Sequence, residues 1–93
     1  MEQPFEWHPD KAAANTAKHG VSFEEASTVF SDSMFITFLD EEHSGDEERF
    51  ITIGLSERNR LLVVAHTDRA GSIRIISARK ATNHERAFYE EGL

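Results

Sequence analysis

The chain has no cysteine, only two prolines and no long apolar run. Without cysteine it can form neither disulfide bonds nor thiolate zinc sites, and this absence fits a reducing compartment. No stretch approaches the roughly 18 apolar residues that a membrane-spanning helix needs. The N-terminal segment MEQPFEWHPDK is acidic and lacks the apolar centre of a secretory signal. We therefore expect a cytoplasmic protein, and 93 residues predict one domain, residues 1–93, with a modest core.

Positive charge is scarce in the first part of the chain. The formal net charge of -7 argues against general binding of nucleic acid by the whole surface. Residues 1–57 contain three lysines and arginines against thirteen carboxylates, whereas residues 58–93 contain seven against four. This asymmetry indicates two surfaces with different partners, although acidic residues that only keep a small protein in solution would give the same pattern.

The cations of the second part gather in two adjoining β-rich runs, LLVVAHTD and SIRIISARKAT. Arg74, Arg79 and Lys80 lie within seven residues of one another. A strand that only fills a core has no need of these charges. The pattern predicts a small rigid sheet that offers positive charge to an anion such as a phosphate.

Helix signals predict two helices before the sheet and one after it. Pro9 can begin a helix, because its missing N–H would have no partner there, and Gly20 can end it. The sequence at 22–25 and again at 82–85 has the spacing of a capping box, in which two side chains each satisfy a backbone N–H of the helix start. These signals predict helices that begin near residues 9, 23 and 83.

The strand runs predict an antiparallel meander. They lie at 5–8, 34–40, 49–57, 61–68 and 72–80. The connections between the last four are too short for a parallel crossover. The predicted class is α+β, with an antiparallel sheet of four to five strands in the order β-α-α-β-β-β-β-α.

The last strand has apolar residues in both phases of its alternation, Ile73 and Ile75 in one and Ile76 and Ala78 in the other. This predicts a central strand that is covered on both sides. Strict alternation also predicts that Arg74 and Lys80 share one face, while Ser77 and Arg79 lie on the other face with Ile73 and Ile75.

Several motifs in this order resemble those of the BrnT toxins, part of the RelE-like superfamily. They are FEWxPxKAAAN, KHGVSFEEAxxVF, EERFITIG after an acidic turn, LLVV-HT, and IRIISAR-AT with a following acidic helix. The likeness covers nearly the whole chain.

The resemblance implies a RelE-like fold and a ribonuclease toxin of a type II toxin–antitoxin pair. It implies RNA cleavage without a metal or other cofactor. It also implies neutralisation by a cognate antitoxin protein that commonly binds DNA and forms a higher-order complex with the toxin. The chain departs from the family at Trp7-His8, at Lys80 and in having only Arg86 as a cation after Thr82. These departures leave an alternative open, a non-catalytic member that only binds the antitoxin.

Cleavage of RNA without a metal needs a base for the ribose 2′-hydroxyl, cations for the charged transition state and an acid for the leaving 5′-oxygen. Arg74 and Arg79 are the predicted phosphate ligands, because a guanidinium meets phosphate oxygens through paired hydrogen bonds. Either could instead pair with a carboxylate. His66 is the predicted acid or base, since histidine titrates near neutral pH, although a histidine hydrogen-bonded at the sheet edge is equally consistent.

Further RNA contacts are predicted for five residues, four of which have a structural alternative. Arg49 could reach across the sheet or pair with a nearby glutamate, Lys18 and His19 could instead favour a helix C-terminus, and Tyr89 could stack on a base or pack on the sheet. The five are Arg49, Lys80, Lys18, His19 and Tyr89. The acidic segment 40–48 contains no recognised metal-binding motif, so it is interpreted as a solvated turn and no metal site is predicted.

Overall fold

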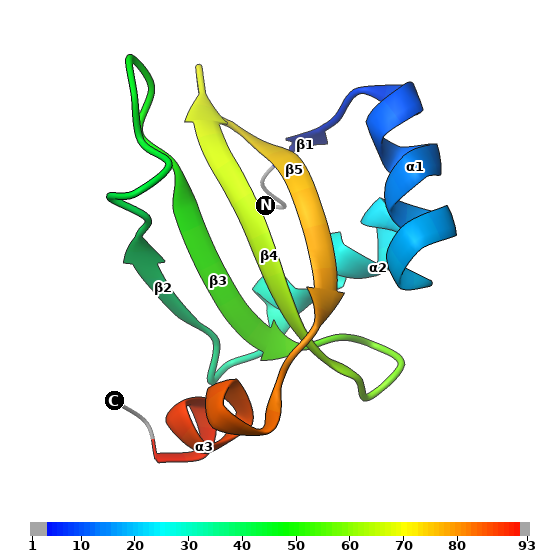
Figure 1. Ribbon diagram of the computed structural model, residues 1–93, viewed down its shortest axis with the longest axis vertical. Coiled ribbons are helices and arrows are strands. Elements are labelled where there is room, and N and C mark those ends of the chain that lie inside the picture. The colour runs from blue at the N-terminus through cyan, green and yellow to red at the C-terminus, as the bar shows by residue number, and fades with distance from the viewer. Residues whose placement is uncertain (1–3, 92–93) are drawn as a thin grey trace.

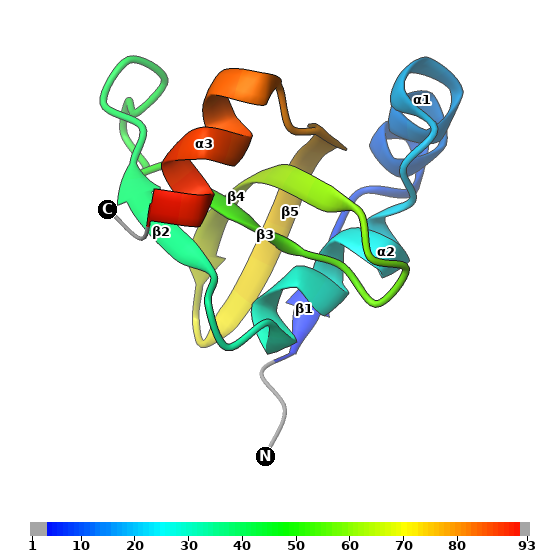
Figure 2. The same ribbon diagram turned by 90° about the horizontal axis from the view of Figure 1, so that it is seen from below.

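The computed structural model describes residues 4–91, in which a five-stranded sheet has helices on both sides (Figures 1 and 2). In chain order its elements are β1 (Phe5–Glu6), α1 (Pro9–His19), α2 (Phe23–Thr28), the short 3-10 helix η1 (Val29–Ser31), β2 (Ile36–Leu39), β3 (Phe50–Leu55), β4 (Leu61–Arg69), β5 (Ser72–Lys80) and α3 (Asn83–Glu91). The predicted α+β class and element order are confirmed.

The strands lie in the order β1-β5-β4-β3-β2. The antiparallel meander of β2 to β5 is confirmed, and β1 joins it in parallel, with Phe5 opposite Ile73 and Glu6 opposite Arg74. The centre of the sheet is therefore β4, and the last strand, β5, is internal and lies between β4 and the short β1. Because β1 is so short, most of the outer edge of β5 lies beside α1 instead of a strand (Figure 1).

A bulge in β5 changes which side chains share a face. Ala65 of β4 lies opposite Ser77, but the next residue, His66, lies opposite Ile75, so Ile76 is an extra residue. A bulge of this kind shifts the alternation by one residue. The predicted division of the strand was therefore wrong.

The cations of β5 are instead assigned to the two faces of the sheet by their partners in β4. Arg74 and Arg79 lie opposite Thr67 and Val63, which alternate regularly along β4, so these arginines share one face. Lys80 lies opposite Leu62 and belongs to the other face.

Each face of the sheet has its own core. On one face, α2 and residues next to it pack on β4 and β5, in a cluster that includes Val21, Phe23, Leu62 and Ile75. On the other face, α3 packs on a smaller cluster whose buried members are Ile53, Leu61 and Val63. Figure 2 shows α3 lying over only part of this second face, towards β2 and β3. The α3 face is thus open near β5.

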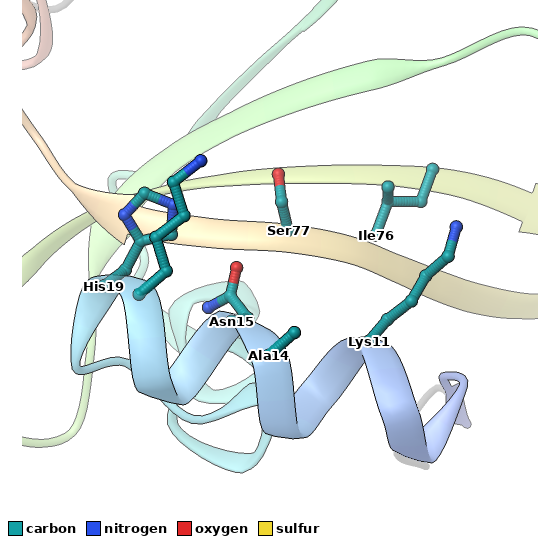
Figure 3. Close-up of a pocket in the computed structure, with 7 residues that line it drawn as sticks. Lys11, Ala14, Asn15, His19, Ile76 and Ser77 are labelled. Atoms are coloured by element: carbon teal, nitrogen blue, oxygen red, sulfur yellow. The ribbon is translucent and has the colours of Figure 1, made fainter.

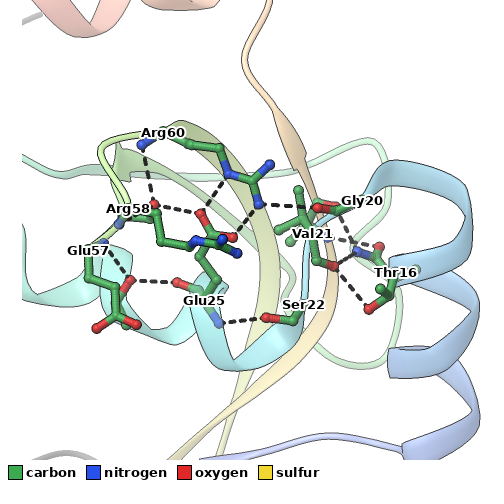
Figure 4. A network of polar contacts seen from close by, with 12 residues as sticks. Thr16, Gly20, Val21, Ser22, Glu25, Glu57, Arg58 and Arg60 are labelled. Atoms are coloured by element: carbon green, nitrogen blue, oxygen red, sulfur yellow. Dashed lines mark hydrogen bonds and ion pairs between the residues drawn. The ribbon is translucent and has the colours of Figure 1, made fainter.

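The predicted capping at 82–85 is complete, with Glu85 N–H donating to Thr82 Oγ at 3.1 Å and Thr82 N–H to Glu85 Oε1 at 2.9 Å. At 22–25 only the first half forms. The carboxylate of Glu25 turns away to accept hydrogen bonds from Ser56 and Arg60, which fixes the β3–β4 turn against α2 (Figure 4). Among residues 4–91 no helix has the length and apolar character needed to cross a membrane.

Candidate functional site

The open part of the α3 face carries a line of polar side chains along β5. Arg74, Ser77 and Arg79 lie opposite Thr67, Ala65 and Val63 of β4, so all three point to this face. We call these three residues the β5 strip. At about 3.3 Å per residue, its two arginines are roughly 13 Å apart along the strand, a span of about two nucleotide units.

Both arginines of the β5 strip are held by carboxylates. Arg74 Nη1 donates to Glu6 Oε2 at 2.9 Å, and Arg79 makes a bidentate pair with Glu85, with both bonds at 2.8 Å. The guanidinium of Arg79 lowers the pKa of Glu85 to about 2, so this carboxylate stays charged at neutral pH. A guanidinium has five N–H donors, so each paired arginine keeps donors for a second anion while its orientation is fixed.

A groove beside the β5 strip contains further cations. It has a volume of about 250 Å³ and lies between α1 and β5. Its lining residues are Lys11, Ala14, Asn15, Lys18, His19, Ile76 and Ser77. Figure 3 shows Lys11 and His19 towards opposite ends, with Ser77 and Ile76 across from the helix. We call this the α1–β5 groove. It adjoins the strip through Ser77, which belongs to both.

Asn15 holds the two walls of this groove together. Its side-chain amide donates to the carbonyls of Ala78 and Val21 at 2.8 and 2.9 Å, while its oxygen accepts from Ala78 N–H at 3.1 Å. The amide therefore pairs with both backbone groups of Ala78, as a neighbouring strand would. Because Asn15 is buried, these bonds fix α1, and the groove cations that it carries, against the strand edge.

His66 lies apart from the two arginines with which it was predicted to act. It is 4 % exposed and points to the α2 face, where Phe50 stacks on it and Phe30 meets it edge-on. Its Nε2 shares a hydrogen bond of 2.7 Å with the hydroxyl of Thr52, and burial lowers its pKa. A phosphate held by Arg74 and Arg79 would lie across the sheet from this ring. The structure therefore does not assemble the predicted catalytic group.

The other predicted residues divide into two sets. Lys18 and His19 come together at the α1–β5 groove. Tyr89 instead packs on the α3-face core, and its hydroxyl donates to Asp32 at 2.6 Å, which raises its pKa to about 12. Lys80 is exposed at the end of β5 on the α2 face, and Arg49 is half-buried just before β3.

Sequence reasoning missed Lys11 and the two carboxylates that hold the arginines. A signal for Lys11 was present, because it precedes Asn15 by four residues and Lys18 by seven, which places all three on one face of a helix. The pairing of Arg74 with Glu6 joins residues far apart in the chain and had no local signal.

The acidic segment 40–48 forms a turn in which His43 Nδ1 lies 2.9 Å from Asp40 Oδ2. Within residues 4–91, no three side chains of the metal-binding types are grouped so that they could hold an ion.

Comparisons with known proteins agree on one family. The family model described as "Ribonuclease toxin, BrnT, of type II toxin-antitoxin system" matches residues 7–85. Among solved structures, the crystal structure of the Brucella abortus ribonuclease toxin BrnT is similar, with a TM-score of 0.68 and 20% sequence identity over 88% of this chain and 100% of that one. No curated protein matches by sequence.

Proposed function

The chain belongs to the family of BrnT ribonuclease toxins of type II toxin–antitoxin systems, and we propose on this basis that it cleaves RNA without a metal ion and is neutralised by a protein antitoxin. The matched region, residues 7–85, includes both the β5 strip and the α1–β5 groove. Such a toxin would act in the cytoplasm, where its RNA substrate and its antitoxin are made.

The arrangement that supports the proposal best is the shared face of Arg74, Ser77 and Arg79 beside the cations of α1. We place the RNA backbone along the β5 strip. One arginine would bind the scissile phosphate and the other a phosphate about two nucleotides away, while Lys11 and Lys18 attract the strand to the α1–β5 groove. Local positive charge of this kind can bind RNA on a protein whose net charge is negative.

The chemistry needs proton transfer as well as charge. A base removes the proton of the 2′-hydroxyl, whose oxygen attacks the phosphorus, and the bond to the 5′-oxygen breaks as an acid protonates it. The products are a 2′,3′-cyclic phosphate and a free 5′-hydroxyl. Arg74 and Arg79 would stabilise the charge that develops on the phosphate oxygens. His19, at the end of the groove, takes the proton-transfer role in this proposal, since His66 is buried on the other face.

The cleavage proposal is tested with purified protein and a single-stranded RNA of mixed sequence, with and without EDTA. We expect cleavage that EDTA does not reduce and products that end in a cyclic phosphate. Removal of Arg79 as Arg79→Ala should lower the cleavage rate by about 100-fold to 1,000-fold, the usual effect of deleting one donor to a transition-state oxyanion. Arg58→Ala is the matched control, because Arg58 is an exposed arginine on the β3–β4 turn. RNA that stays intact at micromolar protein, or equal activity in both variants, would contradict the proposal.

The role of His19 needs its own measurement. His19→Gln should lower the rate of the chemical step much more than it lowers RNA affinity, because a proton-transfer group acts mainly in the transition state. Single-turnover cleavage and RNA binding are measured for this variant and for the control His84→Gln, at an exposed position of α3. Equal losses in rate and affinity would leave His19 only a binding role.

One observation favours a second candidate, a non-catalytic member that only binds the antitoxin. Arg74 and Arg79 each already have a carboxylate partner, which reduces the net charge offered to RNA. This candidate predicts tight antitoxin binding by a protein that leaves RNA intact, so the same cleavage assay separates the two.

A further inference from the structure

The edge strand β2 carries exposed apolar side chains on both faces of the sheet, with Phe38 on the α3 face and Leu39 on the α2 face. Five large apolar side chains in the described part of the chain are between 37% and 63% exposed. Four of them lie in β2 or just before it, and the fifth lies on α3. The five are Met34, Phe35, Phe38, Leu39 and Phe88. Phe38 and Phe88 meet edge-on at 6.1 Å, so the surface continues from the strand to the helix. We call these five residues the β2 patch. Exposed apolar groups on a strand edge favour pairing with another chain.

The backbone of β2 can accept such a partner. It is the last strand in the order β1-β5-β4-β3-β2, so its outer edge has no neighbouring strand within residues 4–91. Figure 1 shows β2 at the side of the sheet farthest from α1, with its outer edge uncovered. The other long sheet edge, along β5, lies beside α1 and is bonded by Asn15. The two edges therefore differ, and in the described part of the chain β2 is the edge that offers apolar side chains together with an unpaired backbone.

Charge next to the β2 patch indicates what kind of segment would bind there. The turn that follows β2, residues 40–48, contains six carboxylates: Asp40, Glu41, Glu42, Asp46, Glu47 and Glu48. The only basic side chain in the turn before Arg49 is His43, which is bonded to Asp40, and Arg69 pairs with Glu47. The remaining carboxylates complement a basic partner, since opposite charges at an interface favour association.

We propose that an extended segment of the cognate antitoxin, apolar on one side and rich in lysine or arginine, adds to the sheet beside β2 as a sixth strand. Main-chain hydrogen bonds would supply affinity, while the β2 patch and the acidic turn select the sequence. This proposal rests on the proposed function only in that the protein is the toxin of a toxin–antitoxin pair. It does not require that the protein cleave RNA.

The position of β2 separates docking from inhibition. Three strand spacings of about 4.8 Å place β2 roughly 14 Å from β5, so a strand beside β2 does not cover the β5 strip. A different part of the antitoxin must reach Arg74 and Arg79. Substitutions at β2 should therefore weaken antitoxin binding and leave RNA cleavage by the free protein unchanged.

Hydrogen exchange locates the partner directly. The protein is purified alone and in complex with the antitoxin encoded beside it, and amide exchange is compared by mass spectrometry. We expect exchange in residues 34–42 to slow at least tenfold in the complex. Unchanged exchange there, with protection elsewhere, would overturn the proposal. So would a free protein that already protects these amides in a concentration-dependent way, because a second copy of this chain would then occupy the edge.

Two pairs of substitutions test the two properties of the surface. Met34→Lys with Leu39→Lys places charge on the apolar edge, and Glu41→Lys with Glu42→Lys reverses the acidic turn. Each pair should weaken antitoxin binding at least tenfold, and the loss from the second pair should shrink as salt is raised. The matched control, Glu24→Lys with Glu57→Lys, reverses two exposed carboxylates on α2 and the β3–β4 turn and should bind as wild type does.

The outcomes separate this proposal from the proposed ribonuclease activity. Normal RNA cleavage by the free protein with unchanged antitoxin affinity in both variant pairs overturns the docking proposal alone. Inactive protein whose antitoxin binding still depends on the β2 patch overturns the cleavage proposal alone. Circular dichroism and the thermal midpoint of each variant establish that the fold is intact.

Discussion

Asn15 is predicted to be the most sensitive polar residue of the candidate site. Its amide makes three hydrogen bonds to backbone groups of Val21 and Ala78. In Asn15→Leu, one N–H and two carbonyls lose this partner, and each buried unsatisfied group costs about 1–3 kcal/mol. Thr16 also lies 3.4 Å from Val21 O and offsets part of the loss. We therefore expect the free energy of unfolding to fall by about 3 kcal/mol, a large share of the roughly 5–15 kcal/mol typical of a domain.

Urea denaturation followed by circular dichroism measures this loss. With a slope of about 1.5 kcal/mol per molar urea, a loss of 3 kcal/mol lowers the midpoint by roughly 2 M. Thr16→Val is the matched control on the same helix, because Thr16 is exposed and its hydroxyl bonds are less buried. It should change the midpoint by less than about 0.5 M. A midpoint in Asn15→Leu within 0.5 M of wild type would refute the reasoning that this amide satisfies the edge of β5.

Asn15→Asp tests the direction in which stability changes with pH. The carboxylate keeps the bond from Ala78 N–H but places negative charge against two carbonyl oxygens, which raises the pKa of the new group in the folded state. The folded form then binds a proton more readily than the unfolded form, so the variant should be least stable at neutral pH and recover as pH falls towards the raised pKa. Asn15→Leu has no such group. A difference between the two variants that does not depend on pH would contradict this account.

Three further predictions concern stability. Burial lowers the pKa of His66, so below about pH 6.5 the unfolded form binds a proton that the folded form does not. The free energy of unfolding, measured by urea denaturation, should therefore fall between pH 7 and pH 5 in the wild type. It should fall less in His66→Gln. The pKa of Glu85 is lowered to about 2, so its contribution to stability is present above the ordinary glutamate pKa near 4.3 and is lost as pH falls towards 2. Glu85→Gln should therefore lower the free energy of unfolding by about 1–2 kcal/mol at pH 7 and leave it unchanged near pH 2. A methyl group on Gly54 would lie 2.7 Å from Val29 Cγ1, so Gly54→Ala should lower the free energy of unfolding by about 1–3 kcal/mol. Gly45 has open space around it, so Gly45→Ala should lower that free energy by less than about 0.5 kcal/mol. Thermal melts of both variants measure the difference.

Features with local signals were predictable from the sequence. Pro9 begins α1, Gly20 ends it in the left-handed conformation at a φ of 68°, and Thr82 caps α3 with Glu85. Each depends on residues only a few positions apart. The meander followed from the short connections between β-rich runs, which leave no room for a crossover.

Features that depend on distant partners were not predictable. The extra residue in β5 is recognisable only from its register with β4, so the faces of Arg74 and Arg79 were assigned wrongly. The position of α1 beside β5 depends on Asn15, which meets Ala78 from far along the chain. The burial of His66 is a different case. Its alternation with Leu62 and Val64 along β4 is a local signal for a core-facing ring, and the sequence does contain it.

The bulge at Ile76 makes the candidate site depend on the length of β5 as well as on its composition. If the extra residue joined the regular alternation of the strand, the same five-residue spacing would put one arginine on each face of the sheet. A relative without this residue would have its two arginines four positions apart, and a regular strand would then keep both on one face. The spacing of the arginines and the bulge must therefore change together if a single phosphate backbone is to meet both.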